Sequence, residues 1–176
     1  MAVLRGSTEG DTFIVTHEYP AARVVLALAR LLVGWIFLWA SIDLLFGLGY
    51  PTDDGMVSGG SPVVDRLEAA RGPVDGMFEW LAGVPAIEWI AVVGLALVGL
   101  AVVLGIGLRL AAAGGAIIAL AAFLAGLPPE ANPVADRHLV YAAVLVGVAM
   151  ANGGEELGLG RWWSRRKFVQ RHPIFR

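Results

Sequence analysis

The stretch that decides the fold is ARVVLALARLLVGWIFLWASIDLLFGLGY, residues 22–50. It begins two residues after Pro20, which suits the first turn of a helix, and it ends before Pro51, which stops one. A helix that crosses a bilayer needs about 20 predominantly apolar residues. The stretch is therefore predicted to be a membrane-spanning helix. The preceding segment has no apolar run of the signal-peptide type, so we expect an uncleaved signal anchor.

The composition of the whole chain agrees with a membrane location. The 176 residues are 57% hydrophobic and 16% charged, whereas about a quarter of the residues in a typical soluble domain are charged. A soluble fold of this length cannot bury so much apolar surface, so lipid must be part of its solvent. Cysteine is absent, which excludes iron–sulfur clusters and cysteine-ligated metals.

Three further apolar stretches, residues 87–108, 110–127 and 136–152, are also predicted to span. Arg109 alone separates the first two, which predicts a tight helical hairpin. The chain is thus expected to be all-α, a four-transmembrane-helix bundle at 22–152. A cytoplasmic segment at 1–21 precedes the bundle, and a basic tail at 153–176 follows it.

The first outer loop, residues 51–86, is predicted to carry two short helices over the mouth of the bundle. Ser61 and Pro62 suit the N-cap and first position of one helix. An apolar patch further along predicts the second; it consists of Met77, Phe78, Trp80 and Leu81.

The distribution of Lys and Arg predicts the orientation, because these residues accumulate on the cytoplasmic side. The tail holds Arg161, Arg165, Arg166, Lys167, Arg171 and Arg176. We therefore expect a multi-pass protein of a bacterial-type cytoplasmic (inner) membrane, with both termini in the cytoplasm.

Small residues at four-residue spacing predict close helix packing in lipid. One set is Ala111, Gly115 and Ala119, and the other is Ala143, Gly147 and Ala151. We interpret both as packing seams within the chain; a homodimer face is the alternative.

Two charged residues lie within the first predicted span. The long side chain of Arg30 is expected to snorkel to the cytoplasmic surface. Asp43 is too short to do so, and an intramembrane carboxylate is a candidate functional residue. Its candidate partners are Arg137 and His138, followed by Arg66 and Arg71. The alternative is a structural ion pair that fixes helix register.

Trp35, Trp39 and Asp43 recur every four residues and share one helix face, with Phe46 close to it. Such an aromatic face beside a carboxylate can hold a quinone ring and relay its proton. Trp35, Trp39 and Phe46 are thus candidate quinone-binding residues, and Asp43, Arg137 and His138 candidate catalytic residues. Packing or interfacial anchoring is the alternative for the aromatic residues.

Other cofactors and partners are not expected. Bis-histidine haem needs two histidines in the membrane, and only His138 lies near it. No metal site or nucleic-acid partner is expected. Arg161–Phe168, RWWSRRKF, follows a predicted span and is interpreted as an anchor on anionic lipid. Docking of an acidic cytosolic protein is the alternative.

Several short motifs together resemble the DoxX/DoxD-like membrane proteins, over roughly residues 22–163. They include RLLVGWIFLWA from Arg30 with Asp43 and Phe46-Gly47, then GSP at Gly60, Gly72-Pro73 and GIGLR at Gly105. Asn132-Pro133 with Asp136, Arg137 and His138, and Gly158-Leu159 before Arg161-Trp162, complete them. The chain departs from that family at Gly160, where the family usually has an aspartate, so no role of that acid is carried over.

This resemblance implies a four-helix bundle tied to quinone-linked sulfur oxidation, as in thiosulfate:quinone oxidoreductase, working beside another subunit. The acidic outer loop argues against attraction of a dianion such as thiosulfate. Its acidic residues are Asp53, Asp54, Asp65, Glu68, Asp75 and Glu79, against Arg66 and Arg71.

The leading hypothesis is a DoxX-like membrane subunit of a quinone-linked redox or respiratory assembly. The rival is a non-catalytic accessory subunit that packs on a larger complex and recruits a partner. A small-solute carrier has less support, because the chain shows no internal repeat.

Overall fold

The computed structural model describes residues 20–71, 74–127, 136–151, 157–172 and 175, and this part of the chain is helical, without strands. Most of the predicted N-terminal segment lies outside the described residues. So do the Gly72-Pro73 and Asn132-Pro133 motifs.

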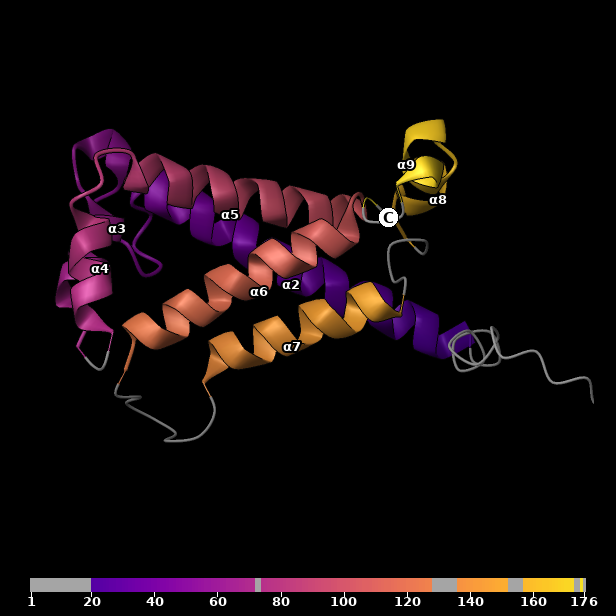
Figure 1. The fold of residues 1–176 in the computed structure, drawn as a ribbon, viewed down its shortest axis with the longest axis horizontal. Coiled ribbons are helices and arrows are strands. Elements are labelled where there is room, and N and C mark those ends of the chain that lie inside the picture. Colours follow the sequence, from indigo (N-terminus) through magenta and orange to yellow (C-terminus); the bar gives the residue numbers. More distant parts are fainter. Residues whose placement is uncertain (1–19, 72–73, 128–135, 152–156, 173–174, 176) are drawn as a thin grey trace, which may run out of the picture.

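Four helices make the body of the protein: α2 (Pro20–Phe46), α5 (Ile87–Leu104), α6 (Leu108–Ala125) and α7 (Arg137–Met150). Helix α2 packs along α5, α5 packs on α6, α6 on α7, and α7 returns to α2 (Figure 1). Each helix therefore has two neighbours, and the apolar core lies between all four.

Three of these helices, α2, α5 and α6, are long and apolar enough to cross a membrane, which indicates a membrane protein. Helix α7 is apolar but has 14 residues. At 1.5 Å per residue it is about 21 Å long, against about 30 Å for the hydrocarbon core of a bilayer.

The turn between α5 and α6 differs from the predicted one. Helix α5 ends at Leu104, because Gly105 and Gly107 both have positive φ, at 72° and 57°. Glycine adopts this left-handed conformation without steric cost. The prediction that Arg109 forms the turn is wrong, since Arg109 lies inside α6. Gly105 and Gly107 make the turn instead.

Helices α2 and α5 approach closely at Gly34 and Gly99. A Cβ atom on Gly99 would lie 2.7 Å from the backbone nitrogen of Leu38 and 2.9 Å from the carbonyl oxygen of Gly34. Around this contact the core is built from Val33, Phe37, Val98, Val102, Leu145 and Val148, with small residues of α6. The close approach therefore depends on the absence of a side chain.

One of the two predicted seams is confirmed. On α6, Ala111, Gly115 and Ala119 are buried. On α7 the prediction is wrong: Ala143 and Gly147 are exposed, and the larger residues Leu145 and Val148 face the core instead. The reason is the partner surface, since the δ-carbon of Leu145 fills the space above Gly115.

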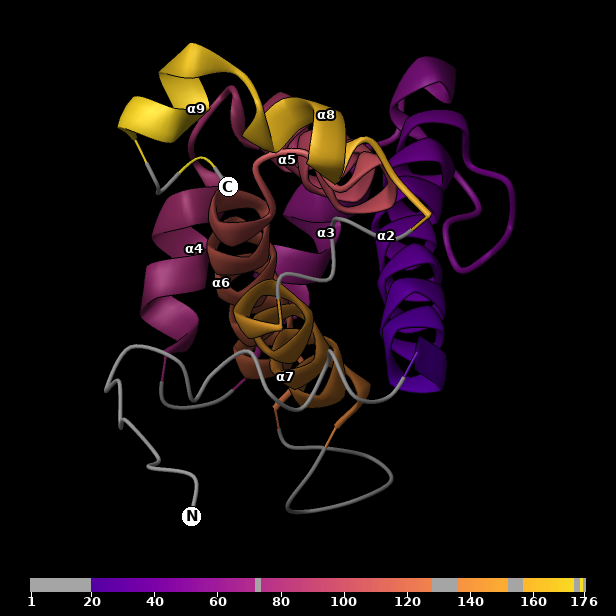
Figure 2. The ribbon, with the colours of Figure 1, turned by 90° about the vertical axis from the view of Figure 1, so that its right-hand side faces the viewer.

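Short helices occupy both ends of the bundle (Figures 1 and 2). At the end where α2 finishes, here called the loop end, lie η1 (Met56–Ser58), α3 (Pro62–Ala69) and α4 (Asp75–Ala82). The two predicted loop helices are thus confirmed. At the opposite end, here called the tail end, α8 (Gly160–Ser164) and α9 (Lys167–Arg171) lie beside the α5–α6 turn.

Ser61 is the N-cap residue of α3 and Pro62 its first residue, as predicted, but the Ser61 side chain makes no capping bond. The carboxylate of Glu88 in α5 takes that role. Its Oε1 accepts from the backbone N–H of Val63 at 3.1 Å and of Val64 at 2.9 Å. A carboxylate at a helix N-terminus also suits the helix dipole. Glu88 therefore joins α3 to the body.

Replacing Gly99 with alanine should destabilise the bundle, because the added methyl group meets backbone atoms that cannot move aside. We expect a loss of about 2 kcal/mol in the free energy of unfolding in detergent, a typical cost of overpacking. Gly147→Ala is the matched control, since a Cβ there meets nothing within 4 Å. Equal stabilities of the two variants would contradict the packing described here.

Candidate functional site

Asp43 lies near the end of α2 and is only 1% exposed. Its Oδ1 accepts hydrogen bonds from the backbone N–H of Leu48 at 3.2 Å and of Tyr50 at 3.1 Å. Its Oδ2 accepts one from the N–H of Thr52 at 2.9 Å. Both carboxylate oxygens are thus engaged by the chain that immediately follows the helix. Asp43 folds this loop back over the end of α2.

The loop can take this path because of its glycines. Gly47 has φ 64° and its N–H donates to the carbonyl of Asp43, which ends the helix. Gly55 packs directly against Gly47: a Cβ on Gly55 would lie 2.3 Å from the backbone nitrogen of Gly47. Any larger residue at either position would push the two segments apart and withdraw the N–H groups from Asp43.

Arg66 connects α3 to the same loop. Its Nη2 donates to Oγ1 of Thr52 at 2.8 Å, and the backbone N–H of Thr52 is one of the three that bind Asp43. Arg66, a lower-ranked candidate partner of Asp43, is therefore linked to Asp43 through Thr52 of the loop.

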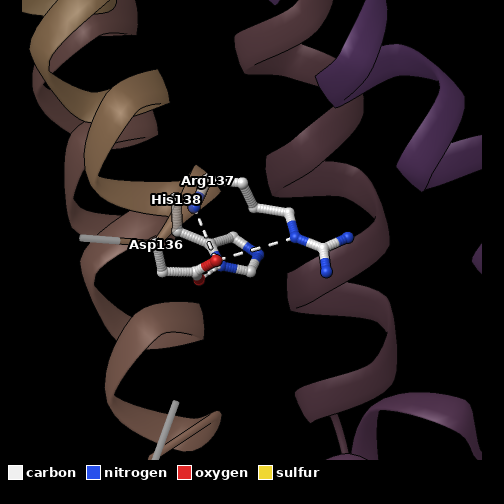
Figure 3. A network of polar contacts seen from close by, with 3 residues as sticks. All are labelled: Asp136, Arg137 and His138. Atoms are coloured by element: carbon white, nitrogen blue, oxygen red, sulfur yellow. Dashed lines mark hydrogen bonds and ion pairs between the residues drawn. The ribbon is translucent and has the colours of Figure 1, made fainter. Parts of the chain in front are cut away.

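Arg137 and His138, the first-ranked partners, belong to a different cluster at the start of α7 (Figure 3). Oδ1 of Asp136 accepts from the backbone N–H of Arg137 at 2.5 Å and lies 3.7 Å from its Nε, and His138 Nδ1 hydrogen-bonds Oδ2 of Asp136. Asp136 is thus the N-cap of α7.

The structure does not bring Asp43 together with either residue of the Asp136 cluster. Within the described residues, the hydrogen bonds of Asp43 come from its own loop, and the ion pairs of Arg137 and His138 go to Asp136. The three candidate catalytic residues therefore occupy two separate networks. Each network has a structural role, one closing the loop after α2 and the other starting α7.

The candidate quinone-binding residues lie on the surface of the bundle. Trp35 is 54% exposed and Phe46 53%, while Trp39 is partly buried. The Trp35 and Trp39 rings have centroids 6.1 Å apart, and Trp39 and Tyr50 6.5 Å. Trp39 Nε1 also donates to the carbonyl oxygen of Tyr50 at 3.4 Å. Trp35, Trp39 and Tyr50 form an aromatic row in which Trp35 and Tyr50 are exposed.

Arg30 is fully buried, with 0% of its surface exposed. Its Nη2 donates to the carbonyl oxygens of Leu157 at 2.8 Å and of Val103 at 3.4 Å. The snorkelling interpretation is wrong, because the chain after α7 covers the guanidinium where solvent was expected. A Cβ on Gly158 would lie 2.9 Å from Nη2 of Arg30, so glycine is needed for this cover.

A backbone bond completes the attachment of the tail. The N–H of Leu159 donates to the carbonyl oxygen of Leu104, the last residue of α5, at 2.8 Å. Arg30 and Leu104 therefore hold the start of the tail against α2 and α5. Single-sequence patterns do not reveal this contact, because its partners are backbone carbonyls far along the chain.

Comparison with known proteins adds no relative. No family model, no curated protein and no solved structure matches the chain. In the part of the chain that the structure describes, no group of three or more histidine, aspartate or glutamate side chains converges on a metal-sized space. The fold and site define a helical membrane protein with two buried charged residues in α2. Arg30 attaches the tail at one end of the bundle, and Asp43 organises the loop at the other end.

Replacing Asp43 with alanine should destabilise the protein, because three backbone N–H groups lose a charged acceptor in a buried place. We expect a loss on the order of 3 kcal/mol in the free energy of unfolding in detergent. The control is Asp53→Ala in the same loop, where the side chain is exposed and no loss is expected. A small effect at both positions would show that Asp43 does not organise the loop.

Replacing Arg30 with methionine should release the tail without dissolving the bundle. We expect amide hydrogen exchange at residues 157–171 to rise about tenfold, since a hydrogen bond from a charged group is lost. Gly158→Ala should have the same effect by displacing the guanidinium, whereas Gly147→Ala should have none. Unchanged exchange in both tail variants would refute the attachment.

Proposed function

We propose that this protein is an integral membrane accessory subunit, a four-span bundle that packs on a larger redox or respiratory assembly and has no catalytic centre of its own. Three long apolar helices support the membrane location. In this proposal α7 is the fourth span and both termini lie in the cytoplasm, which the basic residues of the tail favour.

The engagement of Asp43 is the observation that carries the accessory role. A carboxylate that relays protons to a quinone needs an oxygen that faces the substrate. Here Oδ1 accepts two N–H groups and Oδ2 accepts a third, and the side chain is buried beneath its loop. Protonation of Asp43 would set its loop free, so each catalytic cycle would disturb the local fold. A structural role fits this geometry better.

The resemblance to DoxX/DoxD-like proteins supports the kind of assembly. Members of that group are tied to quinone-linked sulfur oxidation beside a second subunit. The acidic loop after α2 does not favour binding of a dianion by this chain itself. In this proposal another subunit binds the sulfur substrate, and this chain holds that subunit in the membrane.

A quinone site is the second candidate, and the aromatic row favours it. Trp35, Trp39 and Tyr50 lie side by side, facing the space that lipid would fill, with ring centroids 6.1 and 6.5 Å apart. A hydrophobic quinone diffusing in the bilayer has direct access to such a surface. In this case the site is an open surface against lipid, and a neighbouring subunit supplies its other side and the electrons.

The test is purification of the wild type and of Asp43→Asn from the native membrane in mild detergent. We expect both to bring down the same stoichiometric proteins, with quinone-linked turnover per folded assembly changed by less than about twofold. Asp43→Asn should lower only the thermal stability. Asp53→Asn serves as the control for a change of charge in the loop.

Two results would overturn the accessory role. One is a quinone that copurifies with the wild type and is lost in Asp43→Asn while the partner proteins stay. The other is loss of turnover in Asp43→Asn with an intact assembly. Loss of quinone in Trp39→Ala alone would establish the aromatic row as the quinone site and leave Asp43 structural.

A further inference from the structure

We propose that a groove in the tail binds the phosphate of an acidic phospholipid headgroup. The groove has a volume of about 590 Å³, within the usual range of roughly 300–1,000 Å³ for ligand sites. Its lining consists of Gly158, Leu159, Arg161, Trp162, Arg165 and Arg166. The inference requires only that the bundle lies in a membrane, and it does not rest on the accessory role.

The charge of the groove fits an anion. Three of its six lining residues are arginines, and residues 155–176 hold six basic residues against two acidic ones, Glu155 and Glu156. The planar guanidinium group binds phosphate oxygens in pairs, which a lysine ammonium cannot do. The guanidinium of Arg166 stacks on the Trp162 ring, with Cζ 4.0 Å from its centroid. This stack gives the cation a defined position in the groove.

The position of the groove indicates a lipid as the source of the phosphate. The N–H of Leu159 is bound to the carbonyl oxygen of Leu104, at the end of the α5 span. The groove therefore lies at the level where one apolar helix leaves the membrane. Around it, Leu157, Leu159, Trp162 and Phe168 are exposed. Aromatic residues of this kind are enriched at membrane–water interfaces, and the leucines offer contact for acyl chains.

The attachment of the tail makes the groove a formed site. Arg30 and the carbonyl of Leu104 hold residues 157 and 159 in place, and Trp163 Nε1 donates to the carbonyl oxygen of Phe175 at 2.6 Å. A flexible basic tail attracts any anionic surface by its charge alone. A folded tail that fixes arginines around a cavity can distinguish one headgroup from another.

The experiment measures lipid binding to the delipidated full-length protein in detergent. The probes are a short-chain phosphatidylglycerol, a phosphatidylcholine of the same chain length, and inorganic phosphate. We expect the phosphatidylglycerol to bind most tightly. The double variant Arg165→Gln/Arg166→Gln should bind it about 10- to 30-fold more weakly, the loss expected for two basic residues at a membrane surface.

The control double variant, Lys167→Gln/Arg171→Gln, removes the same charge from residues outside the lining, and we expect it to change binding by less than about threefold. Arg165→Lys/Arg166→Lys keeps the charge, and should bind more tightly than the glutamine pair. Equal losses in the glutamine pair and the control would mean diffuse attraction and overturn the site.

Three other outcomes would also overturn the proposal. Displacement of the phosphatidylglycerol by inorganic phosphate at equal concentration would identify a site for free phosphate. Equal binding of phosphatidylcholine would show that the ligand is not an acidic lipid. The same conclusion would follow if the glutamine double variant kept its lipid binding and lost an acidic partner protein.

Discussion

The hydrogen bonds from the Arg30 guanidinium to the carbonyl oxygens of Leu157 and Val103 are the contacts on which the tail end depends. A buried cation in an apolar helix must have its donors satisfied within the protein, because lipid offers no acceptor. The carbonyl oxygens of Val103, near the end of α5, and of Leu157, at the start of the tail, accept from Nη2 of Arg30. The consequence is that α2, α5 and the tail meet at one guanidinium. Removal of Arg30 releases the tail and leaves α2 and α5 packed through the apolar core.

Asp43 is the counterpart of Arg30 at the loop end of the same helix. In the described residues, Arg30 donates to carbonyl oxygens and Asp43 accepts from N–H groups, so both side chains bind main chain. Backbone groups that lie outside regular helices must be satisfied in any case. The two charges of α2 therefore serve the irregular chain at both ends, while Gly34 and Gly99 bring the middle of α2 against α5.

Much of the fold could be predicted from the sequence because it depends on local pattern. Apolar length placed the starts and ends of α2, α5, α6 and α7 to within four residues, and Ser61-Pro62 placed α3. Errors arose where a residue could serve two purposes. Gly105 and Gly107 suit close helix packing as well as a left-handed turn, and the sequence pattern does not distinguish between these two roles. The wrong prediction of a seam on α7 has a similar origin, because the spacing of small residues does not show which face of a helix meets a neighbour.

The site was harder to predict because its contacts are distant in sequence or involve main chain. Glu88 reaches Val63 and Val64 across 25 and 24 residues, and Asp43 binds N–H groups that carry no side-chain signal. The partners chosen for Asp43 were opposite charges, Arg137 and His138, since charge is the only complement visible in a sequence. The sequence did contain a useful signal. Asp43 is followed closely by Gly47, Gly49 and Gly55, and glycines allow the chain to turn back and bind the aspartate.

The contact between Arg30 and Leu157 spans 127 residues, and this distance has a consequence for how the protein is made. Ribosomes deliver α2 to the membrane first, so Arg30 enters the bilayer long before the carbonyl group of Leu157 exists. Water or lipid phosphate must solvate the guanidinium during that interval. The contact closes only after residues 157–159 have been made, and a polypeptide cut short before them leaves the guanidinium without this cover.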